Sequence, residues 1–183
     1  MIFTSEHEAI RQSIAKFVDK EINPYCDQWE KDGIFPAHEL FKKMGDLGLL
    51  GINKPIDCGG LGLDYSYQIV FTEELGRIRS GGVSMAIGVQ TDMATPALAK
   101  YGSDFLREKY LSKAISGEAV FSIAVSEPHA GSDVAAIKTK AVKEGDDYII
   151  NGSKMWITSS TQADYLCVLL NTEGDNDIKT NQW

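Results

Sequence analysis

The chain has 183 residues, of which 43% are hydrophobic and 24% are charged, and its formal net charge at pH 7 is −8. This composition is typical of a globular protein and argues against a disordered or fibrous chain. The negative charge opposes non-specific binding to nucleic acid, and no apolar run approaches the ~20 residues that cross a bilayer.

Cysteine and histidine are too few and too scattered to indicate a metal site. The three cysteines show no CxxC spacing, and the three histidines form no HExxH pattern. Scattered cysteines in odd number are typical of a reducing compartment. The acidic first turns, with Glu6, Glu8 and Asp19, differ from an Arg-rich mitochondrial transit peptide. We therefore expect no metal, and a mitochondrial protein would already have lost such a peptide.

Residues 1–117 predict an all-helical domain. Ser5 followed by Glu8 is typical of a capping box, and Pro24 ends the first helix near Asn23 because proline disfavours a helical residue before it. The spacing of apolar residues predicts four more helices, over residues 36–48, 65–79, 83–99 and 103–117.

Two segments of this domain need a separate interpretation. Residues 58–63 are rich in glycine, but no Lys-Ser or Lys-Thr follows them, which favours a tight connection between helices over a phosphate-binding P-loop. The helix over residues 83–99 is apolar nearly all round, apart from Gln90, Thr91 and Asp92. It therefore belongs at the centre of the bundle, where these polar groups need partners.

From residue 118 onward the apolar residues follow the shorter period of β-strands. Gly145-Asp146-Asp147 and Asn151-Gly152 each predict a hairpin turn. The predicted fold class is α+β: an all-α domain over residues 1–117, then the start of an antiparallel β domain over residues 118–183. The strand-length runs are residues 120–125, 137–142, 148–150, 155–158 and 165–170.

The predicted sheet looks unfinished. About five strands precede a polar segment over residues 171–182, and a sheet that stopped there would leave an open edge. We therefore expect the chain to be a truncated part of a longer protein.

Residues 126–133, Ser-Glu-Pro-His-Ala-Gly-Ser-Asp, form a candidate anion-binding loop. Its small residues let backbone amides approach an anion, and the hydroxyls of Ser126 and Ser132 can donate to it. The alternative is an ordinary polar turn in which the Asp133 side chain accepts a hydrogen bond from a backbone amide.

A second candidate is residues 151–158, Asn-Gly-Ser-Lys-Met-Trp-Ile-Thr. Strand alternation would place Trp156 and Thr158 on one face, where an aromatic plane beside a hydroxyl could pack against a flat ring system. The alternative is a tryptophan in the core of the sheet.

Together, residues 124–133 and 151–158 resemble the two signature segments of the acyl-CoA dehydrogenase family. The resemblance implies a helical N-terminal domain, a β middle domain that binds FAD, and a helical C-terminal domain that we do not find here. This chain differs from the family pattern at Ser126, where threonine is common in the family, and at His129, where glycine is common. By motif position, the resemblance implies that Ile123, Val125 and Ser126 contact the isoalloxazine region of FAD. Gly131 and Ser132 would contact the pyrophosphate. The isoalloxazine ring would also contact Trp156, Ile157 and Thr158.

The resemblance also implies α,β-dehydrogenation of an acyl-CoA thioester, with a carboxylate base and the flavin as hydride acceptor. The family's base is a glutamate of the C-terminal domain, so we assign no catalytic residue in this chain and expect the 183 residues alone to be inactive. Glu127 belongs to the signature loop and is not assigned as the base. The predicted helix over residues 83–99 resembles the family helix that lines the acyl pocket, which makes Gln90, Thr91 and Ala94 candidates for substrate binding. Ser132 of the signature loop is a further candidate. For the helix residues, the alternative is ordinary buried hydrogen bonding.

The family further implies electron-transferring flavoprotein as the acceptor and a homodimer or homotetramer. It implies the mitochondrial matrix in a eukaryote and the cytoplasm in a bacterium. Three alternatives stay open: an acyl-CoA oxidase, a flavin monooxygenase on the same fold, or a non-catalytic truncated product.

Overall fold

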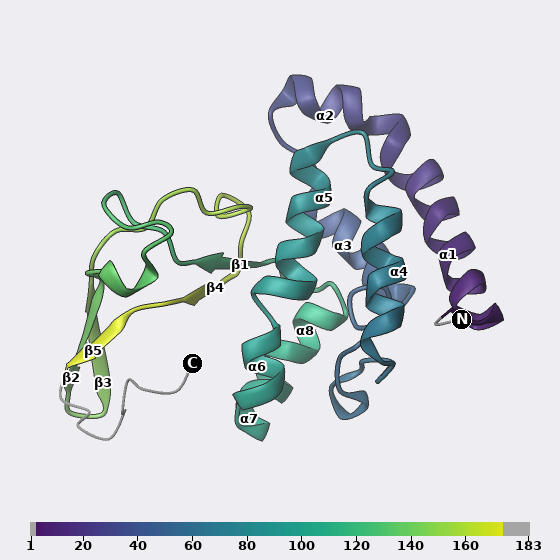
Figure 1. Cartoon of the computed structure of the whole chain (residues 1–183). Coiled ribbons are helices and arrows are strands. Elements are labelled where there is room, and N and C mark those ends of the chain that lie inside the picture. The colour runs from purple at the N-terminus through teal and green to yellow at the C-terminus, as the bar shows by residue number, and fades with distance from the viewer. Residues whose placement is uncertain (1–2, 174–183) are drawn as a thin grey trace. The chain divides into compact units, whose positions relative to one another are not determined.

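The computed structural model describes residues 3–173, which run from a series of helices into a series of short strands (Figure 1). This confirms the α+β fold class. Spatial contacts divide the chain into a helical unit, Met1–Ser122 with Thr158–Leu166, and a strand unit, Ile123–Ile157 with Cys167–Trp183. The domain boundary expected between residues 117 and 118 stays a prediction. None of the helices within residues 3–173 is both long and apolar enough to cross a membrane.

The first helix differs from its prediction at its start, whereas its end at Ile22 agrees with the predicted end near Asn23. Its N-cap is Thr4, which forms a capping box with His7, so the predicted Ser5 and Glu8 pair was wrong. Pro24 sits in a short 3-10 turn, and helical structure then resumes until Gly33, whose φ of 68° ends it. Sequence reasoning missed this resumption. The elements are α1 (Ser5–Phe17), η1 (Val18–Ile22), η2 (Asn23–Tyr25) and α2 (Cys26–Asp32).

The predicted helix over residues 83–99 is divided into α5, the wider π-helical turn η4, and α6. The hydroxyl of Thr95 donates to the carbonyls of Gln90 and Thr91 at 2.8 and 3.2 Å, just before Pro96 begins α6. The predicted helix over residues 103–117 is likewise divided into α7, η5 and α8. The remaining helices are α3 (Ala37–Asp46), η3 (Ile56–Cys58), α4 (Tyr65–Leu75), α5 (Gly81–Gly88), η4 (Val89–Met93), α6 (Pro96–Tyr101), α7 (Asp104–Leu106), η5 (Arg107–Leu111) and α8 (Ser112–Ile115).

The glycine-rich residues 58–63 form a tight connection, as predicted. Gly59 has a φ of 89°, and a Cβ at Gly60 would lie 2.2 Å from the carbonyl oxygen of Lys54. Glycine is therefore required here by backbone geometry and close packing.

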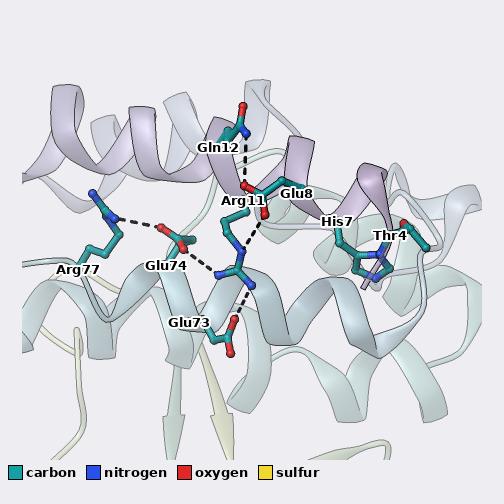
Figure 2. Close-up of polar contacts among 8 residues, drawn as sticks. All are labelled: Thr4, His7, Glu8, Arg11, Gln12, Glu73, Glu74 and Arg77. Atoms are coloured by element: carbon teal, nitrogen blue, oxygen red, sulfur yellow. Dashed lines mark hydrogen bonds and ion pairs between the residues drawn. The ribbon is translucent and has the colours of Figure 1, made fainter. Parts of the chain in front are cut away.

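Helices α1 and α4 pack against each other in the helical unit, and an ion-pair network joins them (Figure 2). The Arg11 guanidinium contacts Glu73 at 2.6 Å and Glu74 at 2.9 Å, and Arg77 contacts Glu74 from the other side at 3.5 Å. The helical unit also contains a large apolar core, whose largest fully buried side chains include Phe41, Phe71, Ile14, Ile22, Met44 and Ile87.

The strand unit contains one predicted hairpin and lacks the other. β2 and β3 are antiparallel, with Glu144 opposite Asp147 and Gly145 at a φ of 65° in the turn. No strand forms over residues 155–158, so that strand and its Asn151-Gly152 hairpin were wrong. A Cβ at Gly152 would lie 2.3 Å from the hydroxyl of Thr139, which indicates that close packing explains this glycine. The strands are β1 (Phe121–Ala124), β2 (Lys140–Glu144), β3 (Asp147–Asn151), β4 (Tyr165–Val168) and β5 (Asn171–Glu173).

Two sheets result. β1 pairs with β4, and the other sheet has the order β3-β2-β5. β5 is parallel to β2, which corrects the expectation of a purely antiparallel domain. β5 begins the segment predicted only as polar, and the rest of that segment lies outside the described residues.

Candidate functional site

The predicted cofactor residues fall mostly in the strand unit. Thr158 is the exception, because it belongs to the helical unit together with the predicted substrate residues Gln90, Thr91 and Ala94. The strand unit holds Ile123, Val125, Ser126, Gly131, Ser132, Trp156 and Ile157.

The loop over residues 126–133 is closed by its own backbone. The amide of Glu127 donates to the carbonyl of Ala130 at 2.8 Å, and the Ala130 amide donates back at 3.1 Å. The next two residues, Gly131 and Ser132, are exposed. Within residues 3–173 their amides donate no hydrogen bond, and a Cβ at Gly131 would meet no heavy atom within 4 Å. The loop therefore presents free donors to an anion.

Trp156 has an unusual backbone and an unusual exposure. Its φ is 59°, in the left-handed region that costs on the order of 1–2 kcal/mol for a residue other than glycine. Its side chain is 85% exposed, although a large aromatic side chain is normally at least half buried. Strain and exposure together are typical of a residue held ready for a ligand.

A backbone hydrogen bond brings the two signature segments together inside the strand unit. The amide of Met155 donates to the carbonyl of Ser126 at 2.9 Å. The free amides of the loop and the exposed indole ring thus belong to one local structure.

Glu127 and Lys154 form an ion pair between the same two segments, at 2.8 Å. The Glu127 carboxylate is 1% exposed and also accepts the amides of Lys138 at 2.6 Å and Thr139 at 2.9 Å. His129 lies 3.3 Å from it. Burial by itself raises the pKa of this carboxyl, but the hydrogen bonds from Lys154, Thr139 and Lys138 outweigh burial and hold the pKa well below its ordinary value.

Sequence reasoning missed this pair. Glu127 was interpreted only as part of the signature and Lys154 was given no role. The available signal was one opposite charge in each of two segments that were already expected to meet at one ligand.

Three of the predicted substrate residues lie in the helical unit, Gln90 and Thr91 on η4 and Ala94 just after it, and all three are buried. Gln90 is 1% exposed, and its side chain donates to the carbonyls of Ala114 and Ala119 and accepts the amide of Phe121. Thr91 donates to the carbonyl of Ile87 at 3.1 Å. These contacts support the alternative of buried hydrogen bonding, and the pocket role of these residues stays a prediction.

Thr158 lines a cavity of about 290 Å³ within the helical unit. Its carbonyl accepts a hydrogen bond from the Ser122 hydroxyl at 2.7 Å. The neighbouring Ser159 has a φ of 64° and a buried hydroxyl without a partner among the described residues. Aromatic rings of Trp29 and Phe35 form part of the wall.

The local chemistry of the strand unit fits a ligand that combines an anion with a flat ring. Free amides suit phosphate oxygens, and an exposed indole suits an aromatic ring. In the part of the chain described here, no group of three or more His, Cys, Asp or Glu side chains is placed to hold a metal ion.

Two family models match the sequence. The model of the acyl-CoA dehydrogenase N-terminal domain matches residues 4–118, and the model of the acyl-CoA dehydrogenase middle domain matches residues 122–182.

Curated relatives and solved structures agree with these matches. Mitochondrial isovaleryl-CoA dehydrogenase of Bos taurus is 38% identical over 92% of this chain and 39% of its own length. Mitochondrial long-chain specific acyl-CoA dehydrogenase of Sus scrofa is also 38% identical, over 92% of this chain and 38% of its own. An acyl-CoA dehydrogenase from Bacillus anthracis, crystallised in complex with FAD, has a TM-score of 0.88 and 32% identity, over 94% of this chain and 30% of that one. This chain thus spans about two fifths of the length of these curated relatives.

Proposed function

Because this chain belongs to the acyl-CoA dehydrogenase family, we propose that its two signature segments bind FAD and that the protein at its full natural length dehydrogenates acyl-CoA thioesters. The observation that carries the proposal is Trp156, which is 85% exposed at a φ of 59°. A strained and exposed indole, linked by backbone to a loop with free amides, has the chemistry of a site for a ring joined to phosphates.

Each part of the site has a distinct task in this proposal. The amides of Gly131 and Ser132 hold the pyrophosphate, and the hydroxyl of Ser126 donates to the flavin. The Trp156 indole covers the ring and excludes water from it. The family motif alone assigns Thr158 to the ring, because this residue belongs to the helical unit. Bound FAD supplies the hydride acceptor for α,β-dehydrogenation.

The acyl group, the partners and the location are further proposals. The isovaleryl-CoA and long-chain relatives are both 38% identical to this chain, so identity alone favours neither acyl length. We propose an acyl-CoA substrate, electron-transferring flavoprotein as acceptor, and a homodimer or homotetramer. The proposed location is the mitochondrial matrix for a eukaryotic source, since both relatives are named as mitochondrial, or the cytoplasm for a bacterial one.

FAD titration into the apo protein at full natural length tests the binding site, with flavin fluorescence as the readout. We expect Trp156→Ala to weaken binding at least about 10-fold, through lost ring stacking and burial. The matched control is Tyr148→Ala, which removes a 44% exposed aromatic from β3 in the same unit and should change affinity less than about twofold. Equal losses in the two variants would contradict the assignment of Trp156.

The reaction is tested separately. Reduction of an artificial electron acceptor should depend on a saturated acyl-CoA, measured with short branched and with long straight acyl groups. FAD binding without turnover of either class would contradict the proposed activity while leaving the cofactor site intact.

A further inference from the structure

The Glu127–Lys154 pair connects the two segments at more points than a simple surface ion pair. Lys154 Nζ contacts Glu127 at 2.8 Å and also donates to the carbonyl of Val125 at 2.8 Å. The lysine side chain is 10% exposed and the carboxylate 1%. One cation from the second segment therefore binds a side chain and a backbone carbonyl of the first.

The carboxylate extends the connection to a third part of the chain. Its two oxygens accept the amides of Lys138 and Thr139, just before β2 begins at Lys140. Both backbone amides belong to the protein itself and stabilise the charge of the carboxylate. The buried carboxylate of Glu127 thus contacts the second signature segment (residues 151–158, the ring-facing segment) and the backbone just before β2, and it belongs itself to the first (residues 126–133, the phosphate-facing loop).

We propose that Glu127 and Lys154 are positioning residues, which set the phosphate-facing loop and the ring-facing segment in one geometry so that both segments become ordered or loosened together. This inference rests on the proposed FAD site. It concerns how that site is held, and neither side chain is assigned a contact with the cofactor.

The charges of Glu127 and Lys154 should also affect the binding of an anionic ligand directly. The chain is acidic, with a net charge of −8, and the proposed ligand is an anion. Lys154 neutralises a carboxylate that lies four residues before Gly131 in the loop. Removing Lys154 would leave an unpaired negative charge near the phosphate position, whereas removing the charge of Glu127 would leave a positive one.

The consequences can be separated with Glu127→Gln, Lys154→Met and the double variant, in the apo protein at full natural length. Each single variant should weaken FAD binding at least tenfold, with the larger loss for Lys154→Met. The double variant should lose no more than the worse single variant, because the two residues act as one unit. Lys154→Arg keeps the charge and should restore most of the affinity. The matched control is Lys143→Met, an exposed lysine on β2, which should stay within about twofold.

Loss of the Lys154 charge and loss of segment positioning should affect FAD and riboflavin differently. Riboflavin carries the same ring without phosphate, so it reports positioning of the ring segment alone. Lys154→Met should therefore weaken binding of both ligands, with the greater loss for FAD. A variant that merely lowered stability would reduce the binding of both by the same factor.

Amide hydrogen exchange of the apo protein gives a readout without any cofactor. In either single variant, peptides over residues 124–133 and 151–158 should exchange faster together, while peptides of α1 and α4 keep their rates. Faster exchange in only one segment would overturn the inference, as would unchanged FAD affinity in both single variants. If the wild-type protein binds no FAD, the proposed function fails, and the exchange experiment still decides whether the pair holds the two segments.

Discussion

The backbone amide of Phe121 donates a 2.7 Å hydrogen bond to the side-chain oxygen of Gln90. The side-chain nitrogen of Gln90 donates to the carbonyls of Ala114 at 3.1 Å and Ala119 at 2.9 Å. One glutamine of η4 therefore satisfies three backbone groups between α8 and the first strand, at a position that is 1% exposed.

Replacing this glutamine tests its structural role. Gln90→Met keeps the volume but leaves a buried amide and two carbonyls without partners, and we expect a loss of about 2–4 kcal/mol in the free energy of unfolding. Urea denaturation measures the loss. The control is Gln12→Met on α1, where the side chain donates an exposed hydrogen bond to Glu8, and it should change stability by less than about 0.5 kcal/mol. Comparable losses would show that the three buried bonds are unimportant.

Ala94 tests the predicted acyl pocket. It is 1% exposed, so Ala94→Leu adds volume at a buried position. If this face lines the pocket, the variant should shift the preferred substrate to shorter acyl chains, since a methylene that no longer fits costs about 1–3 kcal/mol. Chain-length profiles of kcat/KM at full natural length measure the shift. Met93→Leu, at a 48% exposed neighbour, is the control, and an unchanged profile for Ala94→Leu would assign this face to the core.

Gly131 and His129 provide a matched pair in the candidate phosphate loop. A side chain at Gly131 meets open space in the protein itself, so Gly131→Leu should leave the apo stability nearly unchanged. It should nevertheless weaken FAD binding strongly, because the side chain would hold the pyrophosphate away from the amides. His129→Gly removes an exposed side chain and should have much less effect. Equal flavin retention in the two variants would refute the assignment of the loop.

The lowered pKa of the Glu127 carboxyl predicts a loss of stability at low pH. Its pKa lies below the ordinary value of 4.5, so the folded state binds its proton more weakly than the unfolded state. Its contribution to stability is therefore fully present above about pH 5 and is lost as the pH falls below 4.5 toward the lower folded pKa. Glu127→Gln should make the acid loss of unfolding free energy shallower, as measured by urea denaturation between pH 3 and pH 7. An unchanged slope would mean that the carboxyl titrates normally.

Much of this protein follows from local sequence patterns. The spacing of apolar residues predicted where most helices lie, and Gly145 predicted the β2–β3 turn, because burial on one face and a positive φ are local requirements. The resemblance to the acyl-CoA dehydrogenase family located both signature segments, and the structure joins them through the Ser126 carbonyl and the Met155 amide.

Other features depend on partners that are distant in sequence. Residues 155–158 alternate like a strand, yet the Met155 amide bonds to the Ser126 carbonyl and Trp156 adopts a left-handed backbone. The parallel pairing of β5 and the bond between Glu127 and Lys154 were equally absent from the prediction. Periodicity reports which face of a segment is buried, whereas the hydrogen-bond partners of a backbone amide or a buried charge are fixed only when the chain folds. Tertiary structure therefore decided how the predicted segments are held.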